Sequence, residues 1–198
     1  MPKIFNEQDQ KRLRESLLKA GFDMICENGY KATTVDEITK KVKIAKGSFY
    51  LFFASKEEFV AELLMWQYGR FDAYIVHEMK KFALSEKERI HNILTDIAQN
   101  KNHHFFFLRP AEQAEIRNAL NDETWNAFKN DERKFFRRMV CLFGKDPDMC
   151  KPEVVCNLLM SLLASIYAPE HIPFSFAEAM KDTVFYQVQM LFHYITTH

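Results

Sequence analysis

A run of small, hydroxyl-bearing and cationic residues near the N-terminus offers hydrogen-bond donors for phosphates and base edges. Lys46, Gly47, Ser48 and Tyr50 follow one another closely, and Leu51 comes directly after them. A lysine binds a phosphate or a guanine edge, hydroxyl groups donate to phosphate, and a leucine contacts the methyl group of thymine. A glycine lets the backbone come close to a ligand. We interpret this run as the DNA-facing surface of a helix.

Two short helices joined by a tight turn would position this run. Thr34 has capping-box spacing to the glutamate three residues later, in which hydroxyl and carboxylate hold free N–H groups at a helix start. A helix over 34–42 would then turn its apolar residues inward, and a second helix over 45–53 would carry the run. This arrangement is a helix-turn-helix, in which the second helix enters the major groove of DNA.

The wider segment around the run carries many specific positions of one known module. They are Gly29-Tyr30, Ala32-Thr33-Thr34, Ile38, Lys46-Gly47-Ser48-Phe49-Tyr50, Phe53 and Ser55-Lys56-Glu57-Glu58. Across some fifty residues, the segment resembles the N-terminal DNA-binding module of the TetR family of bacterial transcription regulators. After about residue 60, the resemblance is one of layout only.

The resemblance implies a role for each matching position. Thr34 would cap the first of the two helices and offer its start to a phosphate, because exposed N–H groups favour anions there. The run from Lys46 to Tyr50 would face DNA, and Lys56 would hold a flanking phosphate. Two positions depart from the family pattern. Ala45 stands where serine often caps the recognition helix, and Phe52 stands where a polar histidine is frequent.

Helix starts are well marked along the rest of the chain, and strand signals are nearly absent. Capping-box spacing recurs at Ser55, Ser85 and Ser175, and Pro110 and Pro152 suit the first position of a helix. We therefore predict an all-α protein of about nine helices, a three-helix head followed by a helical bundle. The expected helices cover residues 7–28, 34–42, 45–53, 55–84, 85–99, 110–120, 122–143, 152–168 and 175–196, with a short turn over 103–109.

Charge is unevenly distributed along the 198 residues, although the formal net charge is zero. Residues 1–56 carry 11 Lys and Arg against 7 Asp and Glu, whereas residues 57–198 carry 16 against 20. A basic head on an acidic body concentrates phosphate-binding charge in one part of the molecule. We predict a helix-turn-helix DNA-binding domain over 1–54 and a ligand-binding and dimerisation domain over 55–198.

The resemblance also implies that the body dimerises, usually through the last two helices of the chain. Apolar residues recur at helical spacing in both of these segments, and two such helices need a partner surface. An ordinary intramolecular core is the other interpretation. The predicted dimer contacts are Val155, Leu159, Leu162, Ile166, Val184, Val188 and Leu191. A dimer would read half-sites about one helical turn, or roughly 34 Å, apart.

The signal to which such a body responds is less marked in the sequence. Nineteen phenylalanines indicate a thick aromatic core, a pocket for an apolar or aromatic molecule, or both. His103, His104 or Gln113 would supply polar contacts in such a pocket. The residues predicted to line it are Trp66, Phe71, Phe106, Trp125, Phe128, Met139 and Tyr167.

Other functional classes find little support in the sequence. Neither a phosphate-binding glycine loop nor a serine nucleophile elbow is present, so we predict no enzyme and no cofactor. His103 and His104 with Cys141, Cys150 and Cys156 leave open a metal or redox sensor, and a helical interaction protein without specific DNA binding is a further alternative. We find no signal peptide or membrane span and expect a cytoplasmic protein. The preferred hypothesis is a ligand-responsive repressor that binds a near-palindromic operator as a homodimer.

Overall fold

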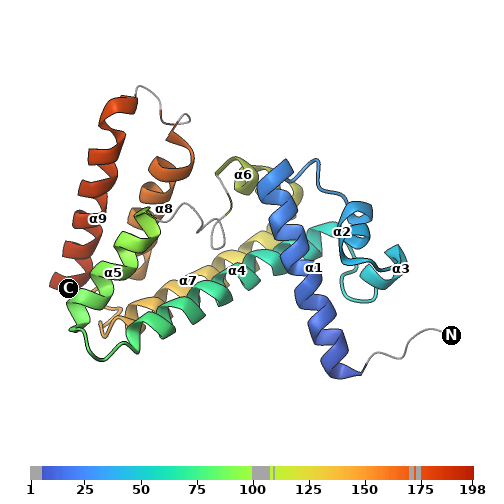
Figure 1. Cartoon of the computed structure of the whole chain (residues 1–198), viewed down its shortest axis with the longest axis horizontal. Coiled ribbons are helices and arrows are strands. Elements are labelled where there is room, and N and C mark those ends of the chain that lie inside the picture. The colour runs from blue at the N-terminus through green and yellow to red at the C-terminus, as the bar shows by residue number, and fades with distance from the viewer. Residues whose placement is uncertain (1–5, 100–107, 109, 170–171, 173–174) are drawn as a thin grey trace. The chain divides into compact units, whose positions relative to one another are not determined.

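The computed structural model describes residues 6–99, 108, 110–169, 172 and 175–198. Within these ranges the chain forms nine α-helices and no strand, so the predicted all-α class is confirmed (Figure 1). None of the helices in these ranges combines the length and the apolar character needed to cross a bilayer. The helices are α1 (Glu7–Asn28), α2 (Val35–Val42), α3 (Lys46–Phe49), α4 (Lys56–Met79), α5 (Glu86–Gln99), α6 (Pro110–Ala119), α7 (Asp122–Leu142), α8 (Pro152–Tyr167) and α9 (Met180–Thr197).

Two of the predicted capping boxes form completely. The Thr34 hydroxyl accepts the backbone N–H of Glu37 at 3.2 Å, and the Glu37 carboxylate accepts the N–H of Thr34 at 2.9 Å. Ser85 and Glu88 form the same reciprocal pair at the start of α5. At the start of α4, the Ser55 hydroxyl accepts the backbone N–H of Glu58. The Glu58 carboxylate, however, accepts the N–H of Ala54 instead of that of Ser55.

The fourth predicted capping box, at Ser175, does not form. The Ser175 hydroxyl donates to the carbonyl of Pro169 at 3.3 Å and so holds the preceding loop. The chain enters a short 3-10 helix, η3 (Ala177–Ala179), before α9 begins at Met180 without a side-chain cap. The last helix therefore starts five residues later than predicted.

Two other helices are shorter than predicted. α3 ends at Phe49 and not at residue 53, because the N–H groups of Phe52 and Phe53 both bond to the Phe49 carbonyl in a turn that brings the second ring into the core. α4 ends at Met79 and not near residue 84. Beyond its end Phe82 is 84% exposed, so no apolar surface holds further helical turns there.

The chain divides into two compact units, and the division differs from the predicted boundary at residue 54. Unit 1 comprises Met1–Trp66 and Ala111–Asn126, and unit 2 comprises Gln67–Pro110 and Ala127–His198. α4 and α7 each contribute to both units. In α4, Phe59 lies close against Gly21 of α1 in unit 1, whereas the later residue Tyr68 packs in unit 2.

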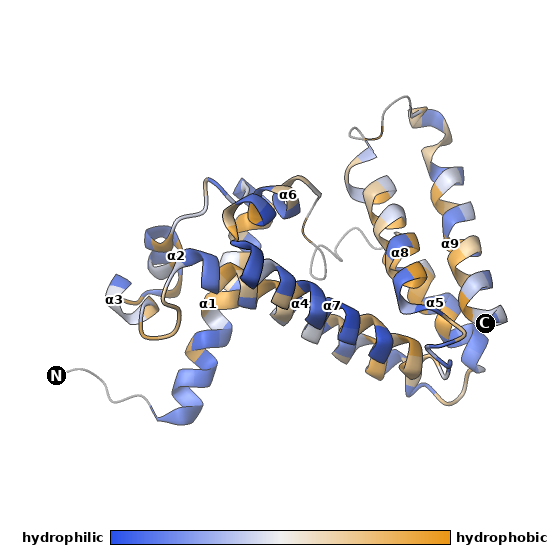
Figure 2. Ribbon diagram, turned by 180° about the vertical axis from the view of Figure 1, so that it is seen from behind, coloured by the Kyte–Doolittle hydropathy of each residue, from blue (hydrophilic) through white to orange (hydrophobic). Residues whose placement is uncertain are grey.

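Unit 2 has an aromatic core around Tyr68 and a three-helix group. The Tyr68 ring stacks on Phe135 at 4.6 Å and on Phe128 at 5.9 Å, and its hydroxyl donates to the buried Glu132 at 2.7 Å. α5, α8 and α9 pack against one another elsewhere in the unit. Figure 2 shows apolar and polar residues alternating around α8 and α9, as expected for helices with one buried face.

The predicted dimer contacts on α8 and α9 are mostly covered within their own chain. Val155, Leu159, Leu162, Val188 and Leu191 are at most 5% exposed, and Ile166 and Val184 are half-buried. The role of these residues in a dimer stays a prediction.

Candidate nucleic-acid interface

Three phenylalanine rings fix α3 in unit 1. Phe49 of α3, Phe53 of the following turn and Phe59 of α4 have ring centroids 5.0–5.3 Å apart, and all three are at most 1% exposed. Tilted and edge-to-face rings at this spacing attract one another beyond their burial. A helix of one turn has little stability of its own, so this cluster determines where α3 lies.

An arginine of α1 also contacts this phenylalanine cluster. The guanidinium of Arg14 pairs through two nitrogens with the carboxylate of Glu62 in α4, and it lies 4.8 Å from the ring centroid of Phe53. It also donates to the Phe52 carbonyl at 3.3 Å. Such a bidentate pair fixes orientation as well as distance. α1, α4 and the turn after α3 are thereby held together.

With the inner face of α3 fixed, the predicted DNA-facing residues lie together on its outer side. Leu51 is 80% exposed and Tyr50 is 47% exposed, although both are large apolar or aromatic side chains. Gly47 is exposed, and a methyl group added there would meet nothing within 4 Å. Lys46 is exposed and Ser48 half-buried. The open space at Gly47 would admit a close backbone approach of a ligand.

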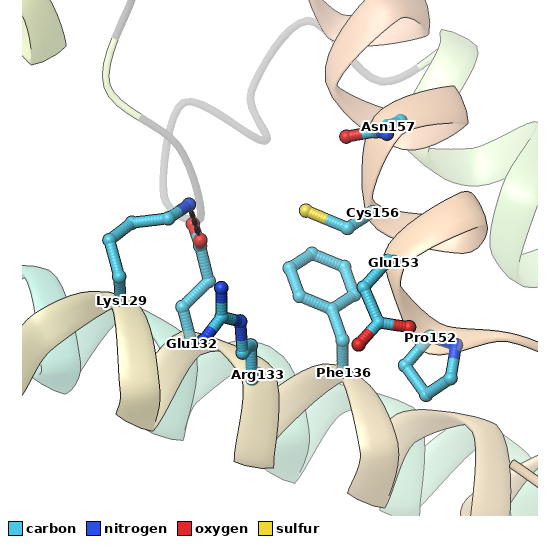
Figure 3. Close-up of a pocket in the computed structure, with 8 residues that line it drawn as sticks. All are labelled: Lys129, Glu132, Arg133, Phe136, Pro152, Glu153, Cys156 and Asn157. Carbon is cyan, nitrogen blue, oxygen red and sulfur yellow. Dashed lines mark hydrogen bonds and ion pairs between the residues drawn. The ribbon is translucent and has the colours of Figure 1, made fainter. Parts of the chain in front are cut away.

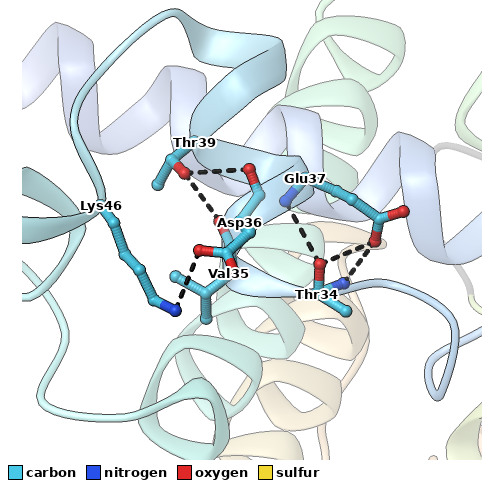
Figure 4. A network of polar contacts seen from close by, with 6 residues as sticks. All are labelled: Thr34, Val35, Asp36, Glu37, Thr39 and Lys46. Carbon is cyan, nitrogen blue, oxygen red and sulfur yellow. Dashed lines mark hydrogen bonds and ion pairs between the residues drawn. The ribbon is translucent and has the colours of Figure 1, made fainter.

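The turn between α2 and α3 depends on a lysine in the left-handed backbone region. Lys43 has φ 60° and ψ 46°, and its N–H bonds to the carbonyls of Thr39 and Lys40 as α2 ends. This conformation usually calls for glycine or asparagine, and no such residue marks the turn in the sequence. The Thr39 hydroxyl, which is buried, donates to the carbonyls of Val35 and Asp36 within α2 (Figure 4).

An acidic residue that the sequence analysis did not single out lies beside the predicted DNA-facing surface. The Asp36 carboxylate in the first turn of α2 pairs with the Lys46 ammonium at 2.9 Å (Figure 4). This hydrogen bond and the negative charge of Asp36 raise the pKa of Lys46. The only sequence signal for Asp36 is its place in the first turn of a helix, where carboxylates are common.

The starts of the two helices are held differently. Thr34 caps α2 as predicted, and the hydrogen bonds from its N–H and hydroxyl lower the pKa of Glu37. The start of α3 has no side-chain hydrogen bond at Ala45, which is the weaker cap expected from the missing serine.

The side chain of Lys56, which was predicted to contact a phosphate, is partly enclosed by the protein. Its ammonium donates to the Tyr30 carbonyl at 2.8 Å and lies 4.1 Å from the centroid of the Tyr30 ring. Burial lowers the pKa of Lys56. The side chain ties the start of α4 to the loop after α1, so in this structure it has a structural contact at the position where the resemblance implies phosphate binding.

The described residues among those predicted to line a pocket are buried or half-buried. Phe71, Phe128 and Met139 are at most 8% exposed. Trp66, Trp125 and Tyr167 are half-buried, the two tryptophans in unit 1 and the tyrosine in unit 2. Phe106, His103 and His104 lie outside the described residues. None of the six described residues lines the cavity between α7 and α8 or the cavity between α5, α8 and α9.

The cavity between α7 and α8 is small, and several charged residues line it. It measures about 260 Å³, and Lys129, Glu132, Arg133, Glu153 and Cys156 all line it (Figure 3). Glu132 already accepts the Tyr68 hydroxyl and pairs with Lys129. Burial raises the pKa of the Cys156 thiol, which favours the unreactive neutral form.

The metal-sensor alternative gains no geometric support from the described part of the chain. No group of three or more His, Cys, Asp or Glu side chains within it is placed to hold a metal ion. Cys141 is exposed, Cys150 is buried and Cys156 is half-buried, and all are free thiols. Burial raises the pKa of Cys150 as well.

A one-turn helix on an aromatic cluster, preceded by a capped helix and a tight turn, defines a helix-turn-helix protein with a larger helical unit. Residues 17–63 match the family described as "Bacterial regulatory proteins, tetR family". Residues 17–63 therefore form the N-terminal helix-turn-helix domain that characterises this family of transcription regulators.

Similarity to individual proteins is concentrated in a short part of the chain. The chain is 33% identical over 60 residues, 30% of its length, to the uncharacterized HTH-type transcriptional regulator YuxN of Bacillus subtilis. It is 40% identical over 62 residues, 29% of its length, to the HTH-type transcriptional repressor KstR2 of Mycolicibacterium smegmatis. The chain spans 21% of the length of YuxN and 30% of that of KstR2.

The fold as a whole has relatives among solved structures. The regulatory protein TetR from Rhodobacter sphaeroides superposes with a TM-score of 0.65, over 92% of this chain and 98% of that chain, at 19% identity. At this identity the similarity establishes the fold alone.

Proposed function

We propose that the protein is a transcription regulator that binds a near-palindromic DNA operator as a homodimer and responds to a small apolar or aromatic molecule. The observation that carries the proposal is the outer side of α3, where Lys46, Gly47, Ser48, Tyr50 and Leu51 are presented by a rigid phenylalanine cluster. Exposed donors on a fixed helix suit the major groove, because base readout needs donors at defined positions.

Two copies are needed to read two half-sites, and we propose a contact surface that differs from the predicted stripes. On α9, Tyr186 is 69% exposed and Met190 is 51% exposed, and the two lie about one helical turn apart. On α8, the small residues Asn157 and Ser161 are exposed at the same spacing. Exposed apolar side chains on one helix and small residues on the other suit close packing of helices across a two-fold axis.

We propose repression as the mode of regulation. The relative KstR2 of Mycolicibacterium smegmatis, which is 40% identical over 62 residues, is described as a transcriptional repressor. A repressor is released when a ligand favours a state that binds DNA poorly. Reversing a 99:1 population requires about 5.5 kcal/mol of differential binding. Burying roughly 200 Å² of apolar ligand surface in one state only supplies about that much.

The first experiment is footprinting of the purified protein on DNA flanking its own coding region, across a series of salt concentrations. If that DNA holds no site, a site selected from a random library takes its place. We expect a protected near-palindrome and a logarithmic affinity that falls linearly with the logarithm of salt. Replacing Lys46 with glutamine should lower the affinity and reduce the salt slope by about one if the lysine contacts a phosphate.

The matched control is Lys134→Gln, which removes an exposed lysine from α7 that also pairs with an aspartate, Asp131, at 2.7 Å. It should leave both affinity and slope unchanged. Absence of a protected site on any DNA, or an equal loss of affinity in both variants, would refute the proposed interface.

A further inference from the structure

A large cavity opens between α5, α8 and α9, entirely within unit 2. It measures about 760 Å³, which lies in the 300–1,000 Å³ range of small-molecule sites. The α5 residues Thr95 and Ala98 face Val184 and Val188 of α9 across it, and Ile166 of α8 lies in its wall. We propose that this cavity is the effector site and that its ligand is an amphipathic organic anion. The inference rests on the proposed function, which requires an effector.

The walls are suited to a hydrocarbon chain or an aromatic ring. Branched and small apolar side chains from all three helices form much of the surface, and Val188 is 5% exposed. Phe185 also lines the cavity, yet it is 56% exposed. An apolar ligand that covers this exposed ring would bind more tightly, because the burial removes apolar surface from water.

The charged groups at the cavity favour an anion. Lys181 is exposed and lines the cavity, and no aspartate or glutamate is among the lining residues that the structure describes. His91 lines it as well, with its ring 5.3 Å from that of Phe192. Thr95, Gln99 and Gln189 add neutral hydrogen-bond donors. The neutral groups can bond to either kind of ligand, because they carry acceptor oxygens as well as donors. Lys181 therefore makes the difference: it attracts a carboxylate or sulfonate and repels an ammonium group.

The cavity between α7 and α8 does not share these properties. It has about a third of the volume, and its two carboxylates, Glu132 and Glu153, stand against two cations, Lys129 and Arg133. Glu132 is already hydrogen-bonded within the protein. A ligand there would have to replace contacts that exist, whereas the larger cavity offers apolar surface and a lysine that forms no ion pair within the described residues.

The test uses the full chain and three ligands that share one ten-carbon tail: decanoate, 1-decanol and decylammonium. Isothermal titration calorimetry measures the affinity of each. We expect decanoate to bind most tightly and decylammonium most weakly. Lys181→Gln should lower the affinity for decanoate by up to about fivefold, the usual limit for an exposed ion pair. It should leave the affinity for decanol unchanged. Lys87→Gln is the matched control, because Lys87 is exposed on α5 and lies outside the cavity.

A second variant tests the location independently of charge. Ala98→Trp fills part of the cavity and should weaken all three ligands at least tenfold. Ala73→Trp places the same side chain at an exposed position of α4 and should weaken none. Circular dichroism verifies that both variants remain helical. If Ala98→Trp unfolds the chain, the comparison of Lys181→Gln with Lys87→Gln tests whether the ligand binds in this cavity.

Two results would overturn the inference: no saturable binding of any of the three ligands, or decanoate binding that neither substitution changes. Footprinting without ligand distinguishes this failure from failure of the proposed function. A protein that protects an operator but binds no decanoate loses only the effector site. A protein that binds decanoate in the cavity but protects no DNA retains the site and loses the role as a regulator.

Discussion

Among single residues, the ion pair of Lys46 with Asp36 affects the charge of the proposed DNA surface. Their ion pair lies in water, with side chains 53% and 69% exposed, so it contributes little to stability. A phosphate can therefore take the place of Asp36 at Lys46 at small cost. The carboxylate nevertheless remains close to that phosphate and repels it. Asp36 thus opposes DNA binding while holding the lysine in place in the free protein.

We predict that Asp36→Asn tightens binding to the operator by about threefold, since a repulsion between two charges about 6 Å apart in water is removed. A fluorescence-anisotropy titration at low salt measures the change, and the gain should shrink as salt is added. Asp131→Asn is the control, because Asp131 pairs with Lys134 on α7 in the same way. Weaker binding by Asp36→Asn would mean that positioning of Lys46 outweighs the repulsion.

Lys46, Gly47, Ser48, Tyr50 and Leu51 could be grouped from the sequence because they are close neighbours in the chain, and their contact with DNA stays a prediction. The pairing of Asp36 with Lys46 could not be predicted, since it joins the start of α2 to the start of α3 across a turn whose geometry depends on Lys43. The contact of Lys56 with Tyr30 was hidden for the same reason, because 26 positions separate them in the chain. Local spacing reveals what lies on a helix and leaves open what another segment brings to it.

Among the helices, the helix starts show the same limit: local spacing does not tell which other segment competes for a side chain. Thr34 and Ser85 cap as their spacing predicts because both partners lie within one turn of the helix. Ser175 has the same spacing, but the Pro169 carbonyl competes for its hydroxyl. Apolar periodicity likewise located the stripes of α8 and α9 without telling whether their own chain or a second copy covers them. Val155 and Leu191 are each 1% exposed within their own chain.

The capping box of α2 makes a prediction about pH. The hydrogen bonds of Thr34 lower the pKa of Glu37, so the ionised carboxylate stabilises the fold above the ordinary glutamate pKa. This contribution is lost as pH falls through the lowered pKa. Urea unfolding should show Glu37→Gln to be less stable than the wild type at pH 7, with the difference vanishing in acid. Glu57→Gln, an exposed neighbour on α4, is the control, and an equal pH dependence in both variants would contradict the assignment.

Close packing of α1 on α4 makes a second prediction at this scale. A methyl group at Gly21 would overlap the buried Phe59 ring, 2.7 Å from its Cε1 atom. Although alanine usually favours a helix over glycine by about 1 kcal/mol, Gly21→Ala should destabilise the protein by roughly 1–3 kcal/mol through overpacking. Gly69→Ala in α4, where nothing lies within 4 Å, should instead stabilise it by about 0.5–1 kcal/mol. Thermal unfolding of both variants tests the contrast.

At the scale of the whole molecule, α4 belongs to both units without a break. Phe59 and Glu62 hold it in unit 1, and Tyr68 holds it in unit 2. The predicted boundary at residue 54 falls just before the helix start marked by Ser55, whereas the two units divide α4 where each half of the helix packs into its own core. The continuous helix links the cores of the two units covalently.

The proposed dimer makes the last prediction. Tyr186→Asp with Met190→Asp places two charges on the exposed face of α9, where pairing with a second copy would bury them unpaired. Sedimentation velocity should show a dimer for the wild type and a monomer for this variant, and its operator affinity should fall because two half-sites are no longer bound together. Phe82→Asp, at an apolar side chain that is 84% exposed beyond α4, should remain dimeric. A wild-type monomer, or a variant that still dimerises, would exclude this face and leave the paired half-sites without a structural basis.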